Sequence, residues 1–224
     1  MPFGPHDTAA GLFQSKQACV FLWSSLSGGA VQTHKLRFGV PHEVVTARCD
    51  VFEATFELVR QFGEAFATTA LVVHVSINSV LLSGLRACPA AVATPSLQAL
   101  RTRGSIRDVA VQSIEQLLAT LEFLRLSLQE MQEQLVPGTA QSPRALVVFS
   151  GLNPLLVGQD TKTLEQVASC LAQLAEQRDV LVAWITAADS ASAAATSDSP
   201  AAPFRRVFAD RSSYIGSDVF ATKE

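Results

Sequence analysis

Short apolar runs alternate with longer amphipathic stretches along most of this chain. The apolar runs have the length and composition of buried strands: Glu43–Ala47, Leu71–Ile77, Ala145–Phe149 and Asp179–Thr186. Apolar residues recur at helical spacing in the stretch 51–66 and in a second stretch from Asp160 or Thr161 to Gln177. Strand, helix and strand in succession predict parallel βαβ units, and therefore an α/β fold with a mostly parallel sheet flanked by helices.

The longest helical stripe is predicted to begin at Ser105 and to run to about Met131. Ser105 with Asp108 three residues later resembles a capping box, and Pro137-Gly138 would stop the helix. Just before this stripe, Leu97–Thr102 is read as a short strand.

The two ends of the chain follow a different pattern. Cys19–Trp23 and Lys35–Phe38 predict a hairpin, so residues 1–41 form an N-terminal arm and residues 42–224 the main domain. The Ala/Ser-rich segment 187–203 is too poor in large apolar groups to pack and is predicted to be a mobile loop. Phe204–Phe208 and Ser212–Phe220 are expected to pair as an antiparallel hairpin at the edge of the sheet.

Composition narrows the possible classes. Of 224 residues 48% are hydrophobic and 17% charged, so the chain can bury a sizeable core; the net charge of −3 argues against binding nucleic acid by bulk charge. We expect neither a membrane span nor a secretory signal. The four scattered cysteines favour free thiols in a reducing compartment over a disulfide, and no Cys/His spacing suggests a metal site.

Nucleotide chemistry is the first function to test in a parallel α/β fold. The chain contains no GxxxxGK[ST] motif, and Arg48-Cys49-Asp50, which join the first strand to the first helix, include neither glycine nor lysine. Ser150 stands where a magnesium-binding acid would end the apolar strand, and we disfavour Ser150 or Asp160 as its substitute. The prediction is no cofactor, no metal, no catalytic residues and no enzyme activity. His74 is read as a core histidine with satisfied hydrogen bonds, not as a general base.

Two groups of arginines are candidates for DNA contact. Arg101 and Arg103 would share one face of an extended segment, with Arg107 nearby. Arg205, Arg206 and Arg211 border the predicted loop. Val80, Leu81 and Leu82 are candidates for partner contact, although core packing explains them equally well.

The order of elements resembles the core of RecA-type recombinases, and in particular the degenerate recombinase paralogues of the Shu complex. The resemblance is carried by Phe56–Phe62 leading into Ala70–Ser83, by Ser105–Leu128, and by Ala145–Leu152 with the helix to Leu174. It implies a non-catalytic nuclear subunit that pairs with a second RecA-like paralogue and small Shu-type partners. Such a subunit binds DNA and promotes recombinase filament assembly in error-free repair and meiosis.

Two alternatives share the same elements. One is a scaffold subunit of another RecA-like assembly, such as an Elongator accessory subunit, because fold alone does not fix function. The other is an enzyme with an unrecognised nucleotide site. The family's basic cluster near the loop is reduced here to Arg205, Arg206 and Arg211, so the resemblance leaves most of the DNA-binding charge to the partner.

Overall fold

A six-stranded sheet, seen in a computed structural model, organises the molecule. The structure describes residues 20–27, 30–46, 51–66, 68–78, 81, 95–133, 144–187 and 214–215. The strands follow the order β5-β4-β6-β7-β3-β8, and every neighbouring pair is parallel. Their bounds are β3 Pro41–Thr46, β4 Ala70–Ser76, β5 Ile106–Ala110, β6 Arg144–Ser150, β7 Val180–Ala187 and β8 Tyr214–Ile215. The predicted α/β fold class with a mostly parallel sheet is confirmed.

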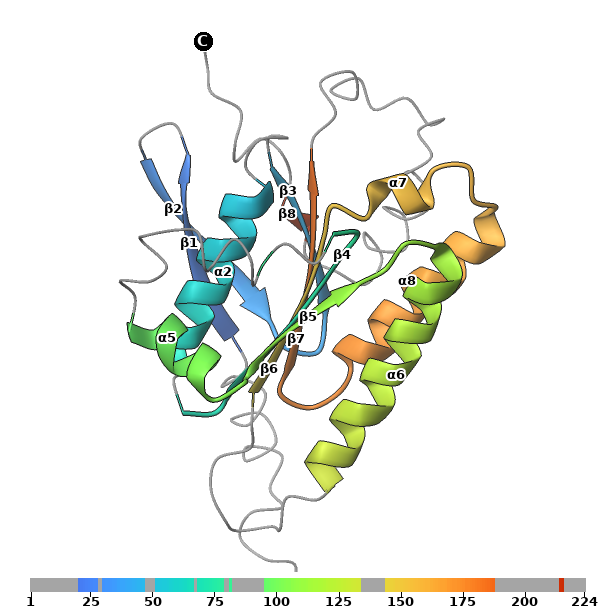
Figure 1. Ribbon diagram of the computed structural model, residues 1–224. Coiled ribbons are helices and arrows are strands. Elements are labelled where there is room, and N and C mark those ends of the chain that lie inside the picture. Colours follow the sequence, from blue (N-terminus) through green and yellow to red (C-terminus); the bar gives the residue numbers. More distant parts are fainter. Residues whose placement is uncertain are drawn as a thin grey trace, which may run out of the picture.

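Helices cover both faces of this sheet (Figure 1). Helices α6 (Ile114–Glu133) and α8 (Thr161–Ala175) pack on one face, over a core that includes Val147, Phe149 and Trp184. Helices α2 (Val51–Ala65) and α5 (Pro95–Thr102) lie on the other, which we call the α2 face, over Val72, Leu146 and Val148. The alternation along the buried strands therefore sorts their side chains into two separate cores.

Strands β3 and β4 belong to the same sheet, although β6 and β7 lie between them. The sequence pattern predicted their parallel direction but not this spacing. The intervening strands are buried on both faces, as their unbroken apolar runs in the sequence indicate.

The start of the long helix differs from the prediction. Ile106–Ala110 forms strand β5, and α6 begins at Ile114. Ser113 Oγ accepts the Gln116 N–H at 3.3 Å, and the Gln116 side chain accepts the Gln112 N–H at 2.8 Å. The capping residues are thus Ser113 and Gln116, whereas Asp108 directs its carboxylate to another strand.

Two further elements correct the sequence prediction. Leu97–Thr102 lies within helix α5, where Leu97 and Leu100 are buried against α2. The approach is close at Gly63 of α2, where a Cβ atom would come within 2.6 Å of Leu100 Cδ1. At the other edge, β8 joins the sheet in parallel with β3, a pairing that the sequence did not predict. Its expected antiparallel partner, Phe204–Phe208, lies outside the described residues, so the hairpin stays a prediction.

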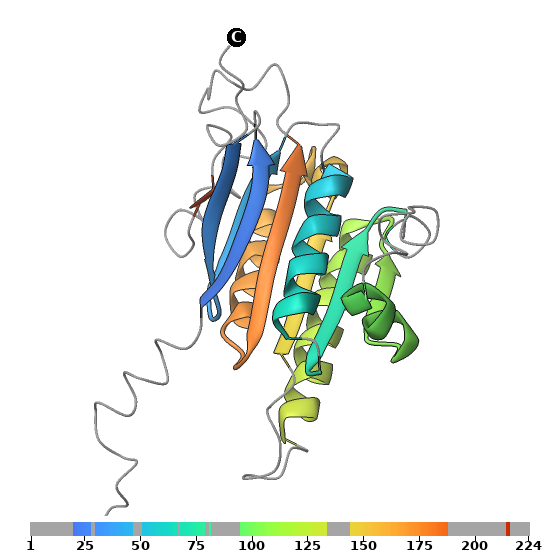
Figure 2. The ribbon, with the colours of Figure 1, turned by 90° about the vertical axis from the view of Figure 1, so that its left-hand side faces the viewer.

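A separate two-stranded antiparallel sheet is formed by β1 (Val20–Ser27) and β2 (Ala30–Arg37). In Figure 2 this hairpin, in blue, and helix α2 are seen on either side of β7. Leu36 joins the core of the α2 face, and Phe38 packs edge-on against Phe66. The N-terminal hairpin therefore extends the cover of the α2 face, while the domain division at residue 41 stays a prediction.

Several predicted features lie outside the described residues: the segment from 188 to 203, Phe204–Phe208, Val80, Leu82, Arg205, Arg206 and Arg211. Within the part that is described, no helix is long and apolar enough to span a membrane. The same residues hold no group of three or more His, Cys, Asp or Glu side chains that could bind a metal ion.

Candidate functional site on the α2 face

Three polar side chains from adjacent strands form a chain of hydrogen bonds toward the carboxyl edge of the sheet. His74 Nδ1 lies 2.8 Å from Asp108 Oδ1, and His74 Nε2 lies 2.7 Å from Ser150 Oγ. We call this set the Ser–His–Asp relay. It connects β6, β4 and β5, and its members are 34 and 76 residues apart in the chain.

Sheet register brings the relay together. His74 is paired with Asp108 across β4 and β5, and Ser76 is paired with Ser150 across β4 and β6. Side chains two residues apart on a strand share a face, so His74 and Ser150 are diagonal neighbours on the α2 face. Parallel pairing thus fixes a geometry that no local sequence pattern contains.

The relay is buried. His74 is 1% exposed, the Asp108 side chain 3%, and Ser150 7%. A carboxylate only accepts hydrogen bonds, so His74 Nδ1–H donates to Asp108, while His74 Nε2 and the Ser150 hydroxyl share the second hydrogen bond. His74 is a core histidine with satisfied hydrogen bonds, as expected, but its two partners are those of a general base.

Ser150 ends strand β6, and the chain turns sharply after it. Gly151 has a φ of 66°, a left-handed conformation that glycine adopts without steric cost, and the short helix α7 (Asn153–Leu156) follows. The Gly151 N–H donates to the Ile185 carbonyl of β7 at 3.4 Å. At the end of β7, buried Thr186 has an Oγ1 atom with no hydrogen-bond partner among the described residues. Hydroxyl groups thus stand at the ends of two adjacent strands.

Three of the candidate DNA-binding arginines, Arg101, Arg103 and Arg107, lie among the described residues. Arg101 belongs to α5 and Arg107 to the edge strand β5, and both are exposed. Arg103 follows α5 and donates hydrogen bonds to the carbonyls of Thr68 and Ala99, at 3.0 and 3.2 Å. The expected common face of Arg101 and Arg103 is therefore wrong, because the segment is helical and Arg103 secures its end.

The predicted partner contact is described at only one of its three positions. Leu81 is fully buried in the core of the α2 face. Core packing therefore accounts for Leu81.

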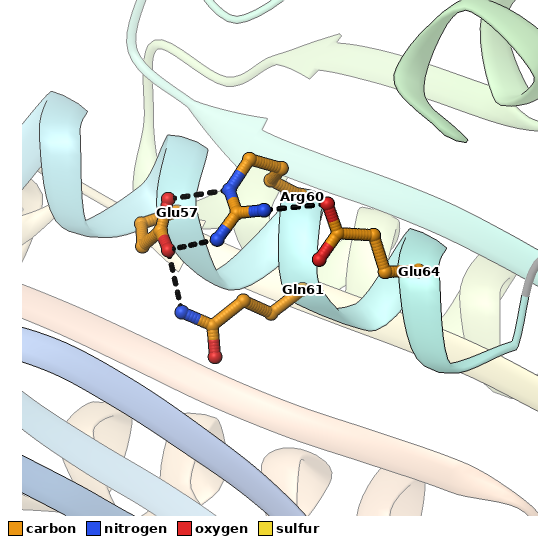
Figure 3. A network of polar contacts seen from close by, with 4 residues as sticks. All are labelled: Glu57, Arg60, Gln61 and Glu64. Carbon is orange, nitrogen blue, oxygen red and sulfur yellow. Dashed lines mark hydrogen bonds and ion pairs between the residues drawn. The ribbon is translucent and has the colours of Figure 1, made fainter. Parts of the chain in front are cut away.

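A second polar network lies on the outer side of α2. Arg60 bridges Glu57 and Glu64, and Gln61 also donates to Glu57 (Figure 3). Burial raises the pKa of Glu57, but hydrogen bonds from Arg60 and Gln61 outweigh this effect and leave the pKa below its ordinary value. The hydrogen bond to Glu57 raises the pKa of Arg60. All four residues lie within two turns of one helix, as is typical of a helix-stabilising ion-pair network.

Sequence reasoning found no set of Ser, His and Asp side chains that contact one another, whereas the structure brings Ser150, His74 and Asp108 together. Each member is ordinary by itself: a histidine in an apolar strand, an acid taken for a helix cap, and a serine ending a strand. The sequence also contains Ser113 and Gln116, which match the capping-box pattern better than Ser105 and Asp108. A helix start at Ser113 would have left residues 106–110, including Asp108, to be predicted as a strand.

Comparison with known proteins gives partial structural likenesses only. No family model matches the chain, and no curated protein does. The cytoplasmic domain of the type VII secretion ATPase EccC from Thermomonospora curvata is 12% identical, with a TM-score of 0.48; the match covers 91% of this chain and 22% of that one. The RadB recombinase is 14% identical over 76% of this chain and 72% of its own, with a TM-score of 0.47. A further solved ATPase domain is 15% identical over 76% and 67%, with a TM-score of 0.43.

The prediction that this chain is not an enzyme is contradicted by these comparisons. Two of the three similar structures are ATPases by name. The prediction relied on the absence of one motif, the phosphate loop, and on the absence of a recognisable catalytic set in the sequence. The chain spans about a fifth of the length of the EccC structure.

Proposed function

We propose that this chain is a recombination-related RecA-like subunit that works with a second RecA-like paralogue and small Shu-type partners. In this proposal the assembly binds DNA in the nucleus and promotes recombinase filament assembly in error-free repair and meiosis. The proposal rests on the resemblance of the element order and on the placement of the segment after β7.

That placement is the observation that carries the proposal. Strand β7 lies between β6 and β3, so the chain leaves the centre of the carboxyl edge after Ala187. It returns at Tyr214–Ile215, which pair with Glu43 and Val44 of β3. The segment that contains Arg205, Arg206 and Arg211 therefore starts and ends beside β3. Ligands of open parallel sheets bind at this edge, and the resemblance puts a DNA-binding loop there.

A surface for the RecA-like partner is available on the outer face of α6. Phe123 is 67% exposed, and Leu126 and Met131 are also exposed on the same helix. Phe123 and Leu126 are one turn apart on the exposed side of the helix, and exposed large apolar side chains are typical of protein interfaces. We assign this face to the second RecA-like paralogue.

Affinity purification of the full chain from cells that express it natively, followed by mass spectrometry, tests the partner. We expect a RecA-like paralogue and recombination factors, and we expect Phe123→Ser with Leu126→Ser to remove them. Glu122→Gln with Glu130→Gln on the same helix is the matched control and should retain them. Recovery of tRNA-modification factors would support the Elongator-type alternative, and recovery of neither group would overturn both.

DNA binding by the purified complex tests the second half of the proposal. The triple variant Arg205→Ser, Arg206→Ser, Arg211→Ser should weaken binding to gapped DNA. The slope of log affinity against log salt should fall by about 2 to 3, because each lost phosphate contact removes about 0.7 to 0.9. Arg101→Ser with Arg107→Ser removes two exposed arginines at the opposite edge of the sheet and serves as the comparison. An unchanged slope in the triple variant would count against DNA contact at this edge.

A further inference from the structure

We propose that Ser150 is a nucleophile, activated by His74 and positioned by Asp108, that accepts small acyl groups from activated esters. This inference is independent of the recombination proposal, since it concerns the α2 face of the sheet and uses none of the arginines. In this proposal, the Ser–His–Asp relay carries out acyl transfer.

Hydrogen-bond geometry is the first argument. A serine hydroxyl becomes nucleophilic when a neutral imidazole nitrogen lies within about 2.6 to 3.2 Å and can take its proton. Ser150 Oγ and His74 Nε2 meet this condition at 2.7 Å. A carboxylate on the other ring nitrogen fixes the tautomer and stabilises the imidazolium that forms, and Asp108 lies there at 2.8 Å.

The burial of the relay in an apolar core also supports a catalytic role. An acid and a histidine inside an apolar core carry a desolvation cost, and the flanking strand residues Val72, Leu146 and Val148 are fully buried. A serine hydroxyl that only needed a partner could use a nearby backbone carbonyl instead. The relay uses two additional buried polar residues to orient one hydroxyl, as catalytic serines require.

Position within the sheet is the third argument. Within the relay, His74 is 1% exposed and Ser150 7%, so the residue that carries the hydroxyl is more accessible than the histidine that it contacts. Ser150 is the last residue of β6 and precedes the left-handed turn at Gly151. The carboxyl ends of parallel strands are where open α/β sheets present reactive groups to ligands.

The proposed reaction has two steps. Ser150 Oγ forms a bond to the ester carbonyl carbon while its proton moves to His74 Nε2. The carbon–oxygen bond to the leaving alcohol then breaks, and that oxygen takes the proton from His74. Water attacks the acyl-serine by the same route, releasing a carboxylic acid and restoring the Ser150 hydroxyl.

The test is covalent labelling of the full chain with a fluorophosphonate, with the modified residue identified by mass spectrometry, together with p-nitrophenyl acetate hydrolysis. We expect a single label at Ser150, lost in Ser150→Ala and retained in Ser127→Ala, a control serine on α6. His74→Gln should slow labelling by about 10²- to 10⁴-fold, the usual contribution of a general base. Asp108→Asn should slow it and change its pH profile, because the ring tautomer is no longer fixed.

Circular dichroism and urea unfolding of each variant separate loss of reactivity from loss of fold. If Asp108→Asn or His74→Gln does not fold, the comparison of labelling at Ser150 in wild type with its loss in Ser150→Ala decides the inference. The inference is overturned if folded wild-type chain leaves Ser150 unlabelled, or if a folded His74→Gln variant labels at the wild-type rate. Either result leaves the partner and DNA experiments unaffected.

Discussion

Two polar networks in this molecule use the same kinds of contact in opposite settings. The Ser–His–Asp relay joins three strands inside the α2 face, where His74, Ser150 and the side chain of Asp108 are buried. The Glu57–Arg60–Glu64 network lies on the outside of one helix, with Arg60 and Glu57 side chains about a quarter to a third exposed. Distance alone does not separate the two networks, since both contain short hydrogen bonds. The two networks differ in the burial of their side chains and in the sequence separation of their members.

This difference sets what each network contributes. Exposed ion pairs interact through water and add little to stability, whereas a buried polar group without its partner carries its full desolvation cost. Removal of one member of the relay should therefore lower the free energy of unfolding by a large amount. Removal of one member of the α2 network should lower it by a small amount. The following experiments test this contrast in order of expected effect.

Asp108→Ala should give the largest effect. The variant leaves His74 Nδ1–H in the core without its acceptor, so we expect the free energy of unfolding to fall by about 3 kcal/mol. Urea unfolding followed by circular dichroism measures this change. Arg107→Ala, one residue earlier on the same strand but exposed, is the control and should change it by less than about 0.5 kcal/mol.

A double-mutant cycle with Ser150→Ala sharpens the same test. Asp108 and Ser150 each contact a different ring nitrogen of His74. A coupling energy of at least about 0.5 kcal/mol would therefore demonstrate that they act as one network. Additive effects would mean that the relay is two separate hydrogen bonds, and the contrast with the α2 network would then rest on burial alone.

Sequence information was sufficient for the α2 network and for most of the fold. Spacings of three and four residues within a helical stripe are local, so Glu57, Arg60 and Glu64 could be placed on one helix from the sequence. The buried strands β6 and β7 could also be predicted from the sequence, because their apolar runs match the composition of central parallel strands.

The relay could not be predicted in the same way. It depends on strand order and register, which place His74 opposite Asp108 and diagonal to Ser150 although the three are far apart in sequence. The sequence reading also absorbed Asp108 into a helix, because Ile106, Val109 and Ala110 fit a helical stripe as well as a strand. Short apolar segments are ambiguous between these two periods, and only long-range pairing decides them.

Ser113→Ala should have an intermediate effect. Ser113 is local in sequence, like the α2 network, but it accepts a backbone N–H that would otherwise lack an intrahelical partner. We expect a loss of about 1 kcal/mol in the free energy of unfolding. Ser127→Ala, in the interior of the same helix, is the control and should be neutral or slightly stabilising. Equal effects at the two serines would show that the cap does not contribute.

Arg60→Ala should be less destabilising than either change. It removes both ion pairs of the network, and exposed pairs contribute about 0.2 to 1 kcal/mol. The loss should shrink further in about 1 M salt, where charges on the surface are screened. Unfolding in urea at low and high salt measures both quantities, with Arg101→Ala on α5 as the control for removing an exposed helical arginine. A loss as large as that of Asp108→Ala would abolish the contrast between the two networks.

The smallest expected effect is the pH dependence contributed by Glu57. Burial raises its pKa, but the hydrogen bonds from Arg60 and Gln61 bring it below the ordinary value of 4.5 in the folded chain. The unfolded chain therefore binds a proton first as the pH falls. The stabilisation from Glu57 is fully present above about pH 4.5 and is lost as the pH drops through the folded-state pKa. The stability difference between wild type and Glu57→Gln should accordingly narrow between pH 6 and pH 3, measured as urea midpoints at each pH. A difference that stays constant over this range would mean that the Arg60 contact does not favour the charged carboxylate, so even the modest role given to the exposed network would be too large.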